Sequence, residues 1–167
     1  MRSMMHKAAL AALFGLAAGS AGAAVTVNYV ALEQYPDLPR LEADREDLLK
    51  DLSRHFVKLG HKLAPGQDLR IEVLDLDLAG HLIPGVLRGK DARILGNLAS
   101  DGPSVTMRYS LQQDNQVVYS GVVTLLDPHY LQHRPRYWDN VPLRYEKTMI
   151  DDWFERSFPQ PSLQASR

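Results

Sequence analysis

The chain has 167 residues, 45% of them hydrophobic, and a net charge of −1 from 19 Lys and Arg against 20 Asp and Glu. It contains no basic run of the kind that binds phosphate backbones, so we expect no nucleic-acid partner. The chain also has no cysteine. This excludes disulfides, a Cys-ligated metal and a Cys nucleophile, so a conventional hydrophobic core must hold the fold.

The first 23 residues have the layout of a secretory signal peptide. Arg2 and Lys7 supply positive charge, residues 8–18 are apolar, and residues 21–23 (Ala-Gly-Ala) suit a signal peptidase. The apolar run is shorter than the roughly 20 residues that span a membrane, so we expect no transmembrane segment in the mature protein. In a Gram-negative source this predicts a periplasmic protein. We predict a signal peptide over 1–23, a single α+β domain over 24–158 and a flexible tail over 159–167.

The beginning of the domain predicts a strand, a helix and a second strand. Residues 24–31 (AVTVNYVA) alternate and are rich in β-forming side chains, which indicates a strand. Apolar residues at spacings of three and four predict a helix over 44–59. In the strand predicted at 69–78, the apolar residues change phase part-way along. Either a bulge near Val73–Leu74 switches the faces or both faces are covered, and we favour the bulge.

Two further strands form a predicted hairpin. Residues 104–111 (SVTMRYSL) and 116–126 (QVVYSGVVTLL) have clear strand patterns. Asp114 and Asn115 lie between them and are typical of a tight turn. Gly121, inside the second of these strands, indicates a bulge or the close approach of another element.

Two irregular segments and a final helix complete the chain. Residues 81–102 contain four glycines and a proline, which predicts a long loop or hairpin excursion with a short strand at 92–95. Residues 127–142 contain three prolines among polar and aromatic residues, and we expect an ordered connector there. Apolar residues along one side of 143–158 predict the last helix.

Together these elements predict an α+β fold. Its centre is a mostly antiparallel four-stranded sheet, in the chain order strand–helix–strand–strand–strand–helix, with the two helices packed on one face. A sheet that is covered on one side only leaves its second face exposed to solvent. That exposed face is one of the surfaces on which we look for a function.

Three motifs carry a resemblance to a known family. They are Asp75–Gly80 (DLDLAG), Leu125–Leu131 (LLDPHYL) and Leu143–Phe154 (LRYEKTMIDDWF). With these motifs, the chain resembles the bacterial exported domain-of-unknown-function family 3016 over nearly the whole predicted domain. The resemblance implies an exported bacterial domain without an established activity, ligand or catalytic residue. The family pattern often has Asn where this chain has His129, so no mechanism rests on that histidine.

Asp75 and Asp77 are the most conspicuous acidic residues of the predicted sheet. Two residues apart on one strand, they share a face with their Cβ atoms roughly 7 Å apart. Such a pair can hold a hard cation or divide acid and base roles. The alternative, which we favour, is a solvent-facing pair or a salt bridge to a neighbouring strand, for example to Arg108.

The connector offers further metal ligands in Asp127, His129 and His133. The His-x₃-His spacing suits zinc only on a helix, and Pro128 and Pro135 disfavour a helix there. We therefore favour a structural or solvent-exposed role for these side chains. The metal-ligand candidates of the chain are Asp75, Asp77, His129 and His133.

Aromatic residues of the connector and the last helix are candidates for a recognition cleft. Tyr130, Tyr137, Trp138 and Tyr145 combine a large apolar area with polar atoms that suit sugars or peptides. Packing in the core or connector is the interpretation that we favour. On the same helix, we interpret Lys147 as the i,i+4 surface partner of Asp151.

No Gly-x-Ser-x-Gly elbow, His-Glu-x-x-His motif, phosphate loop or dinucleotide fingerprint is present, and we predict no cofactor. We therefore predict a non-catalytic binding or accessory module of the cell envelope, with an envelope protein or glycan as its partner. The exposed face of the sheet and the segments 81–102 and 127–142 are the surfaces through which it could bind. The alternative is a periplasmic metal-dependent hydrolase that uses Asp75 and Asp77. The candidate binding residues are Asp75, Asp77, Asp127, Tyr130, Tyr137, Trp138 and Tyr145.

Overall fold

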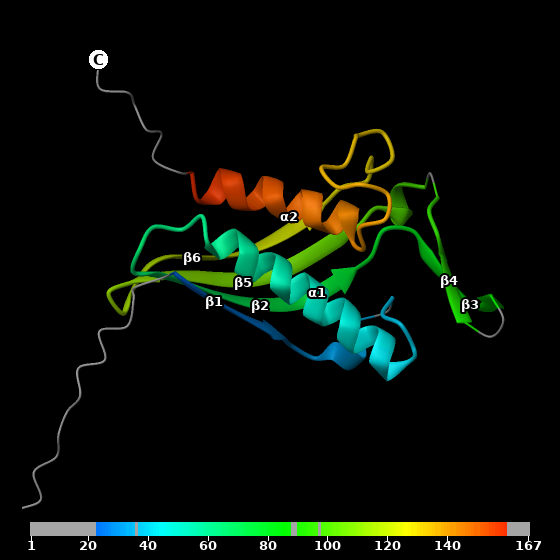
Figure 1. The fold of residues 1–167 in the computed structure, drawn as a ribbon, viewed down its shortest axis with the longest axis horizontal. Helices are drawn as coiled ribbons and strands as arrows, with labels where there is room; N and C mark the ends of the chain where they lie inside the picture. The colour runs from blue at the N-terminus through cyan, green and yellow to red at the C-terminus, as the bar shows by residue number, and fades with distance from the viewer. Residues whose placement is uncertain (1–22, 36, 88–89, 97, 160–167) are drawn as a thin grey trace, which may run out of the picture.

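The computed structural model describes residues 23–35, 37–87, 90–96 and 98–159. The predicted signal peptide (1–23) and tail (159–167) lie outside this part, except for Ala23 and Pro159. The elements in chain order are β1 (Ala24–Tyr29), α1 (Glu42–Gly60), β2 (Gln67–Asp77), β3 (His81–Leu87), β4 (Lys90–Ile94), β5 (Ser104–Gln113), β6 (Gln116–Leu126) and α2 (Arg144–Ser157) (Figure 1).

Four of the strands form one mixed sheet in the order β1-β2-β5-β6. β1 and β2 are parallel, and α1 provides the long crossover that a parallel pair needs. The β2–β5 and β5–β6 pairs are antiparallel. The predicted α+β class is confirmed, and the sheet is mixed because one of its pairs is parallel.

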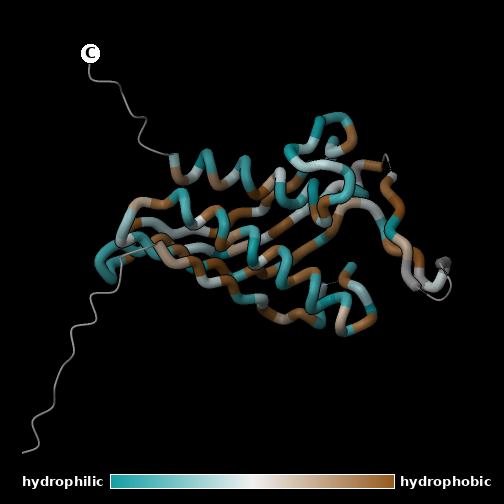
Figure 2. The backbone as a smooth tube through the Cα atoms, in the orientation of Figure 1, coloured by the Kyte–Doolittle hydropathy of each residue, from teal (hydrophilic) through white to brown (hydrophobic). Residues whose placement is uncertain are grey.

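Both helices lie on the same face of the four-stranded sheet (Figure 1). The core between them is built from side chains with no exposed surface, such as Phe56 of α1, Ile71 of β2, Met107 of β5 and Ile150 of α2. Burying each such side chain contributes about 1.5–3 kcal/mol. Figure 2 shows hydrophobic residues along the strands and hydrophilic residues on the outer turns of the helices.

No helix among the described residues is both long and apolar enough to cross a membrane.

A bulge in β2 keeps its apolar side chains on the covered face. The pairing with β5 shifts register between Val73 and Asp75, so Leu74 is the extra residue. Because of this shift, Leu76 is buried on the same side as Val73, although the two are an odd number of residues apart. The predicted bulge near Val73–Leu74 is confirmed.

The β5–β6 hairpin follows its sequence signals closely. Asp114 and Asn115 form its turn with φ of 51° and 64°, the left-handed values that a two-residue type I′ turn requires. A Cβ atom at Gly121 would lie 3.1 Å from the Tyr109 hydroxyl of the neighbouring strand. The close approach predicted at this glycine is confirmed.

The predicted excursion at 81–102 is a two-stranded hairpin, β3–β4, that projects from the end of the main sheet (Figure 1). Arg93 of β4 anchors it. Its guanidinium donates to the Asp37 carboxylate at 2.5 Å and to the Asp37 carbonyl at 2.9 Å. It also contacts the carbonyls of Leu78, Ala79 and Gly80 at 3.3–3.4 Å. One side chain thus ties the hairpin to the end of β2.

We expect Gly80→Ala to lower the free energy of unfolding by about 1–3 kcal/mol. Gly80 has φ of +79°, and a Cβ atom there would clash with the backbone carbonyl of Ile94. Gly85 is a matched control, because it has φ of +70° but no atom within 4 Å of an added Cβ. Urea denaturation should show a larger loss for Gly80→Ala than for Gly85→Ala. Equal losses would show that the clash of the added Cβ with Ile94 does not affect the free energy of unfolding.

Candidate functional site

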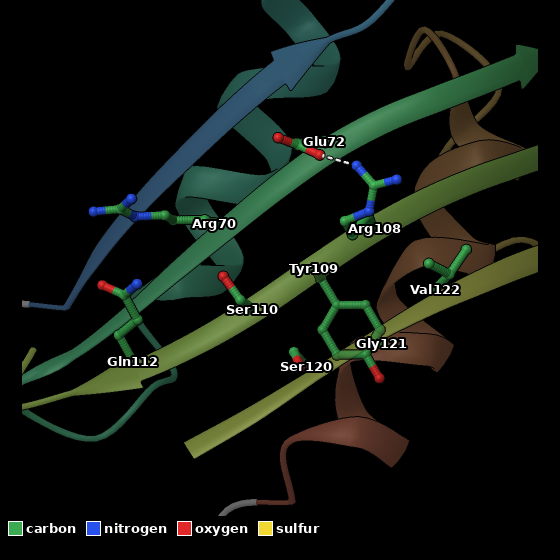
Figure 3. A pocket seen from close by; sticks show the side chains of 9 residues that line it. All are labelled: Arg70, Glu72, Arg108, Tyr109, Ser110, Gln112, Ser120, Gly121 and Val122. Carbon is green, nitrogen blue, oxygen red and sulfur yellow. Dashed lines mark hydrogen bonds and ion pairs between the residues drawn. The ribbon is translucent and has the colours of Figure 1, made fainter. Parts of the chain in front are cut away.

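The candidate site is the face of the sheet opposite the helices, which we call the open face. Alternate residues of a strand share a face, and on β2 and β5 those of the open face are mostly polar (Figure 3). On β6 the polar residues Ser120 and Thr124 alternate with the apolar Val122 and Leu126 on this face. A shallow depression of about 450 Å³ lies across these three strands. It is lined by Arg70, Glu72, Arg108, Tyr109, Ser110, Gln112, Ser120, Gly121 and Val122.

One ion pair crosses the depression. Arg108 lies opposite Glu72 in the pairing of β5 with β2, and its Nη1 is 2.5 Å from Glu72 Oε2. Both side chains are largely exposed, so solvent screens the pair and its net contribution to stability is about 0–1 kcal/mol. Arg70 extends away from this pair, toward β1 (Figure 3). Within the described residues it makes no ion pair, so its charge remains available to a ligand.

The floor of the depression is continuous with the core. Tyr109 points to the helix-covered side, and its ring packs edge-on against Trp153 of α2 with centroids 5.2 Å apart. Its hydroxyl lies next to Gly121, which has no side chain to cover it. Burial, and then the neighbouring Tyr119, raises the pKa of Tyr109 above its usual value. The tyrosine therefore remains neutral on the covered side of the sheet, beneath the depression.

The lining residues are suited to binding rather than to reaction. Arginine, glutamine and serine side chains offer hydrogen-bond donors and acceptors, and Val122 adds an apolar contact. None of the lining residues is a histidine, so Ser110 and Ser120 have no imidazole base beside them in the depression. The arrangement can recognise an extended polar surface.

Asp75 and Asp77 lie beyond the bulge of β2, outside this depression. Asp75 is paired with Thr106, and Arg108 bonds Glu72 instead. The suggested salt bridge from the aspartates to Arg108 is therefore wrong, because the bulge displaces them along the strand. Burial, followed by the charges of the neighbouring carboxylates, raises the pKa of Asp77 despite the opposing charge of Arg93.

The structure does not bring the proposed metal ligands together. Asp127 lies close to both connector histidines: it accepts a hydrogen bond from the His129 backbone at 3.1 Å and is 3.7 Å from His133 Nε2. Asp75 and Asp77 are on β2 instead. Within the part of the chain that the structure describes, no group of three or more His, Asp or Glu side chains is placed to share a metal ion.

Three of the four candidate aromatic residues have intramolecular partners. The Tyr130 hydroxyl donates to the Gly96 carbonyl at 2.9 Å, and its ring packs edge-on against Tyr145 at 4.8 Å. The Tyr137 hydroxyl donates to Asp151 at 2.6 Å. Trp138 differs, because it is 76% exposed. The tyrosines therefore hold the connector against α2, and only the tryptophan is presented to solvent.

Two buried polar pairs join α1 to α2. His55 Nε2 lies 2.8 Å from Asp151 Oδ1, and neither atom has another polar partner among the described residues. Lys147 Nζ lies 2.7 Å from Asp51 Oδ2. The interpretation of Lys147 as a surface partner of Asp151 is wrong, because both side chains point toward α1 rather than along their own helix. We call these four residues the helix seam.

The environment of Asp151 stabilises its ionised form. Burial by itself would raise the pKa of this carboxyl group. The contact with His55, the hydrogen bond from Tyr137 and the charge of Arg136 outweigh burial, and together they lower the pKa below its usual value. Asp151 is therefore a paired, ionised group inside the fold.

Residues 23–156 match the family model described as "Protein of unknown function (DUF3016)". The chain belongs to this family. Searches of the curated proteins and of the solved structures found no match. The resemblance indicated by the three motifs is therefore confirmed, and membership in DUF3016 assigns no activity, ligand or catalytic residue to the chain.

The structure explains the charged residues of the last motif of this DUF3016 chain. Glu146 is buried and accepts a hydrogen bond from the Ala79 backbone at 2.7 Å, at the end of β2. Burial raises its pKa. Asp152 pairs with Arg136 of the connector at 2.5 Å, and Lys147 and Asp151 belong to the helix seam. The acids and the lysine of LRYEKTMIDDWF therefore contact other elements of the fold.

The helix seam is the feature that the sequence reasoning missed, although a signal was present. Lys147 lies four residues after Leu143 and three before Ile150, so it occupies the apolar stripe of α2. His55 similarly lies three residues after Leu52 on the stripe of α1. A polar residue within an apolar stripe indicates a buried partner on another element.

We expect Asp151→Asn to lower the free energy of unfolding at neutral pH by about 1–3 kcal/mol, because it removes the charge that pairs with His55. The folded-state pKa of Asp151 is lowered, so its contribution is fully present above the unfolded value of about 3.9. It is lost as the pH falls through the folded value. Urea denaturation over a pH series should therefore show that the free energy of unfolding falls less steeply with decreasing pH in Asp151→Asn than in the native chain.

Asp152→Asn is the matched control for this change. Asp152 is the next residue of α2, but its side chain is 45% exposed, so the substitution should cost less than about 1 kcal/mol. An Asp151→Asn variant with the same pH dependence as the native chain would contradict the assignment of Asp151 as the acid-sensitive group.

Proposed function

We propose that this DUF3016 protein is an exported, non-catalytic binding module of the cell envelope that recognises a partner protein through the open face of its sheet. The observation that carries the proposal is the depression of about 450 Å³ lined by hydrogen-bonding side chains. Its rigid floor is packed on the core through Tyr109. Sites that are built on strands hold their side chains in fixed positions, which favours recognition without reorganisation.

The chemistry of the open face favours a polypeptide over a glycan. Arginines beside an exposed apolar residue are typical of protein–protein interfaces, and Arg70, Arg108 and Val122 provide this combination. The aromatic residue of the depression, Tyr109, is only 8% exposed, so its ring is not available to stack on a sugar. An extended segment with polar groups and a carboxylate suits these side chains better.

The alternative hydrolase hypothesis has no comparable geometric support. Asp75 is exposed and Asp77 is half-buried. The basic residue whose charge lowers the pKa of Asp77 is Arg93, and its guanidinium anchors the β3–β4 hairpin through Asp37. A two-carboxylate hydrolase needs a metal ion or a positioned water between its carboxylates. The described residues supply no third metal ligand beside the pair.

Photo-cross-linking in living cells tests the open face. We expect a photoreactive residue introduced at Ser110 to form a protease-sensitive adduct with another protein, because Ser110 lies inside the depression. The adduct should be reduced at least about fivefold by Arg108→Ala, which removes a central interface arginine at a cost of about 1–3 kcal/mol. The readout is the mass of the adduct on denaturing gels.

A photoreactive residue at Arg54, exposed on the outer side of α1, is the matched control and should form no such adduct. An adduct that resists protease but is removed by glycan hydrolases would show a glycan partner instead. Equal adducts from Ser110 and Arg54 would contradict recognition through the open face.

Export is tested separately, because it rests on the sequence of residues 1–23 alone. We expect cell fractionation to place the protein in the periplasm, and mass spectrometry to show a mature chain that begins at Ala24. Replacing the small residues at 21 and 23 by charged ones should cause the precursor to accumulate. A cytoplasmic protein that retains residues 1–23 would contradict the export prediction.

A further inference from the structure

β6 forms an edge of the main sheet, and one side of this strand is unpaired. The sheet order places β5 on one side of β6, and no described strand lies on the other. In an antiparallel pair, every second residue directs its N–H and C=O away from the partner strand. From Tyr119 to Leu126, β6 therefore presents a row of backbone donors and acceptors to solvent.

Between Tyr119 and Leu126, after a bulge at Val118 in the pairing with β5, this edge lacks the features that usually prevent strands from pairing between molecules. Long edges are normally interrupted by lysine, by proline, by inward charges or by a β-bulge. The sequence of β6, QVVYSGVVTLL, contains no charged residue and no proline. The opposite edge, β1, is only 6 residues long, and its exposed positions are Ala24, Thr26 and Asn28. The unprotected edge is therefore β6.

Large exposed hydrophobic side chains gather on the same strand. They are Val117, Val118, Tyr119, Val122 and Leu126, which are between 52% and 62% exposed. Tyr119 lies on the helix-covered side, where its ring contacts Tyr109, and Val122 and Leu126 lie on the open face. Pairing at this edge would therefore cover exposed apolar side chains on both faces of the sheet. Strand pairing would satisfy the backbone groups and bury these side chains at the same time.

We propose that β6 pairs antiparallel with β6 of a second copy of this chain, which joins the two sheets into one continuous eight-stranded sheet. The charge of the strand favours a second copy over a different partner. A two-fold contact places identical residues near one another, and a charged strand would then oppose its own charge. β6 contains no charged residue, so two copies of it would not repel each other. It also offers no opposite charge to a charged strand of a different protein.

The face alternation of β6 also fits a two-fold axis at Val122. Directly opposed residues of an antiparallel pair share a face. With Val122 opposite Val122 of the second copy, Ser120 lies opposite Thr124 on the open face. Apolar residues then meet at the axis, and hydroxyl-bearing residues flank it on both sides.

The dimer has a consequence for the open face. Ser120, Gly121 and Val122 of β6 form one wall of the depression. A two-fold axis perpendicular to the joined sheet leaves the open faces of both copies on the same side. The two depressions would therefore lie side by side across the axis. This inference does not depend on the proposed recognition function, because it concerns only the pairing of the edge.

The absence of cysteine makes disulfide trapping a clean test. Opposed Cα atoms of an antiparallel pair are roughly 4.5–5.5 Å apart, which lies within the roughly 4.4–6.8 Å range of a disulfide. We expect the full chain with Val122→Cys, expressed with its own N-terminal segment, to form a covalent dimer on mild oxidation. Val57→Cys is the matched control, because Val57 is also exposed but lies on α1, and it should form no covalent dimer.

Sedimentation velocity of the full chain over a concentration series provides the second measurement. The native chain should form dimers, and Val122→Lys should weaken the dimer at least about tenfold by placing two ammonium groups at the axis. Val57→Lys should leave the dimer unchanged, and circular dichroism should show that both variants are folded. A native chain that stays monomeric up to about 1 mM would overturn the proposal. A dimer that Val122→Lys does not weaken would also overturn it.

Discussion

The relative position of the two helices depends on the helix seam. Asp51 and His55 are one turn apart on α1, and Lys147 and Asp151 are one turn apart on α2. The contacts Asp51–Lys147 and His55–Asp151 run in the same order along both helices, so the helices are roughly parallel. Buried polar groups are costly without partners, so this arrangement admits few alternatives. Sliding α2 by one turn would oppose Asp51 to Asp151 and leave Lys147 unpaired.

With both helices on one face, the opposite face of the sheet and its edges are exposed to solvent. The covered face carries the core, and the bulge at Leu74 allows all of β2 to contribute to it. The open face therefore has no packing role to constrain its side chains. Its ion pair between Glu72 and Arg108 is too exposed to stabilise the fold substantially. The side chains of the open face are thus the ones that folding constrains least.

Sequence reasoning succeeded where the determining interactions are local. The alternation of β6, the Asp114–Asn115 turn and the phase change in β2 each depend on residues close together in the chain, and each was predicted from the sequence. It failed where the partner is distant. Lys147 contacts Asp51, 96 residues away, and Arg93 contacts Asp37, 56 residues away. A single sequence shows that such a residue is polar and well placed for burial, but it does not show which residue will be its partner.

The same distinction bears on how the DUF3016 motifs are interpreted. The acids and the lysine of Leu143–Phe154 bond α1, the connector and the end of β2, so the most distinctive motif of the chain reports its architecture. Contacts between elements of the fold therefore account for the pattern of charges in this motif. The depression on the open face contains none of these motif residues. Its side chains lie on strands whose register is fixed by the core, so the fold determines their positions. Because these side chains do not pack in the core, folding places little constraint on which residue types occupy the positions.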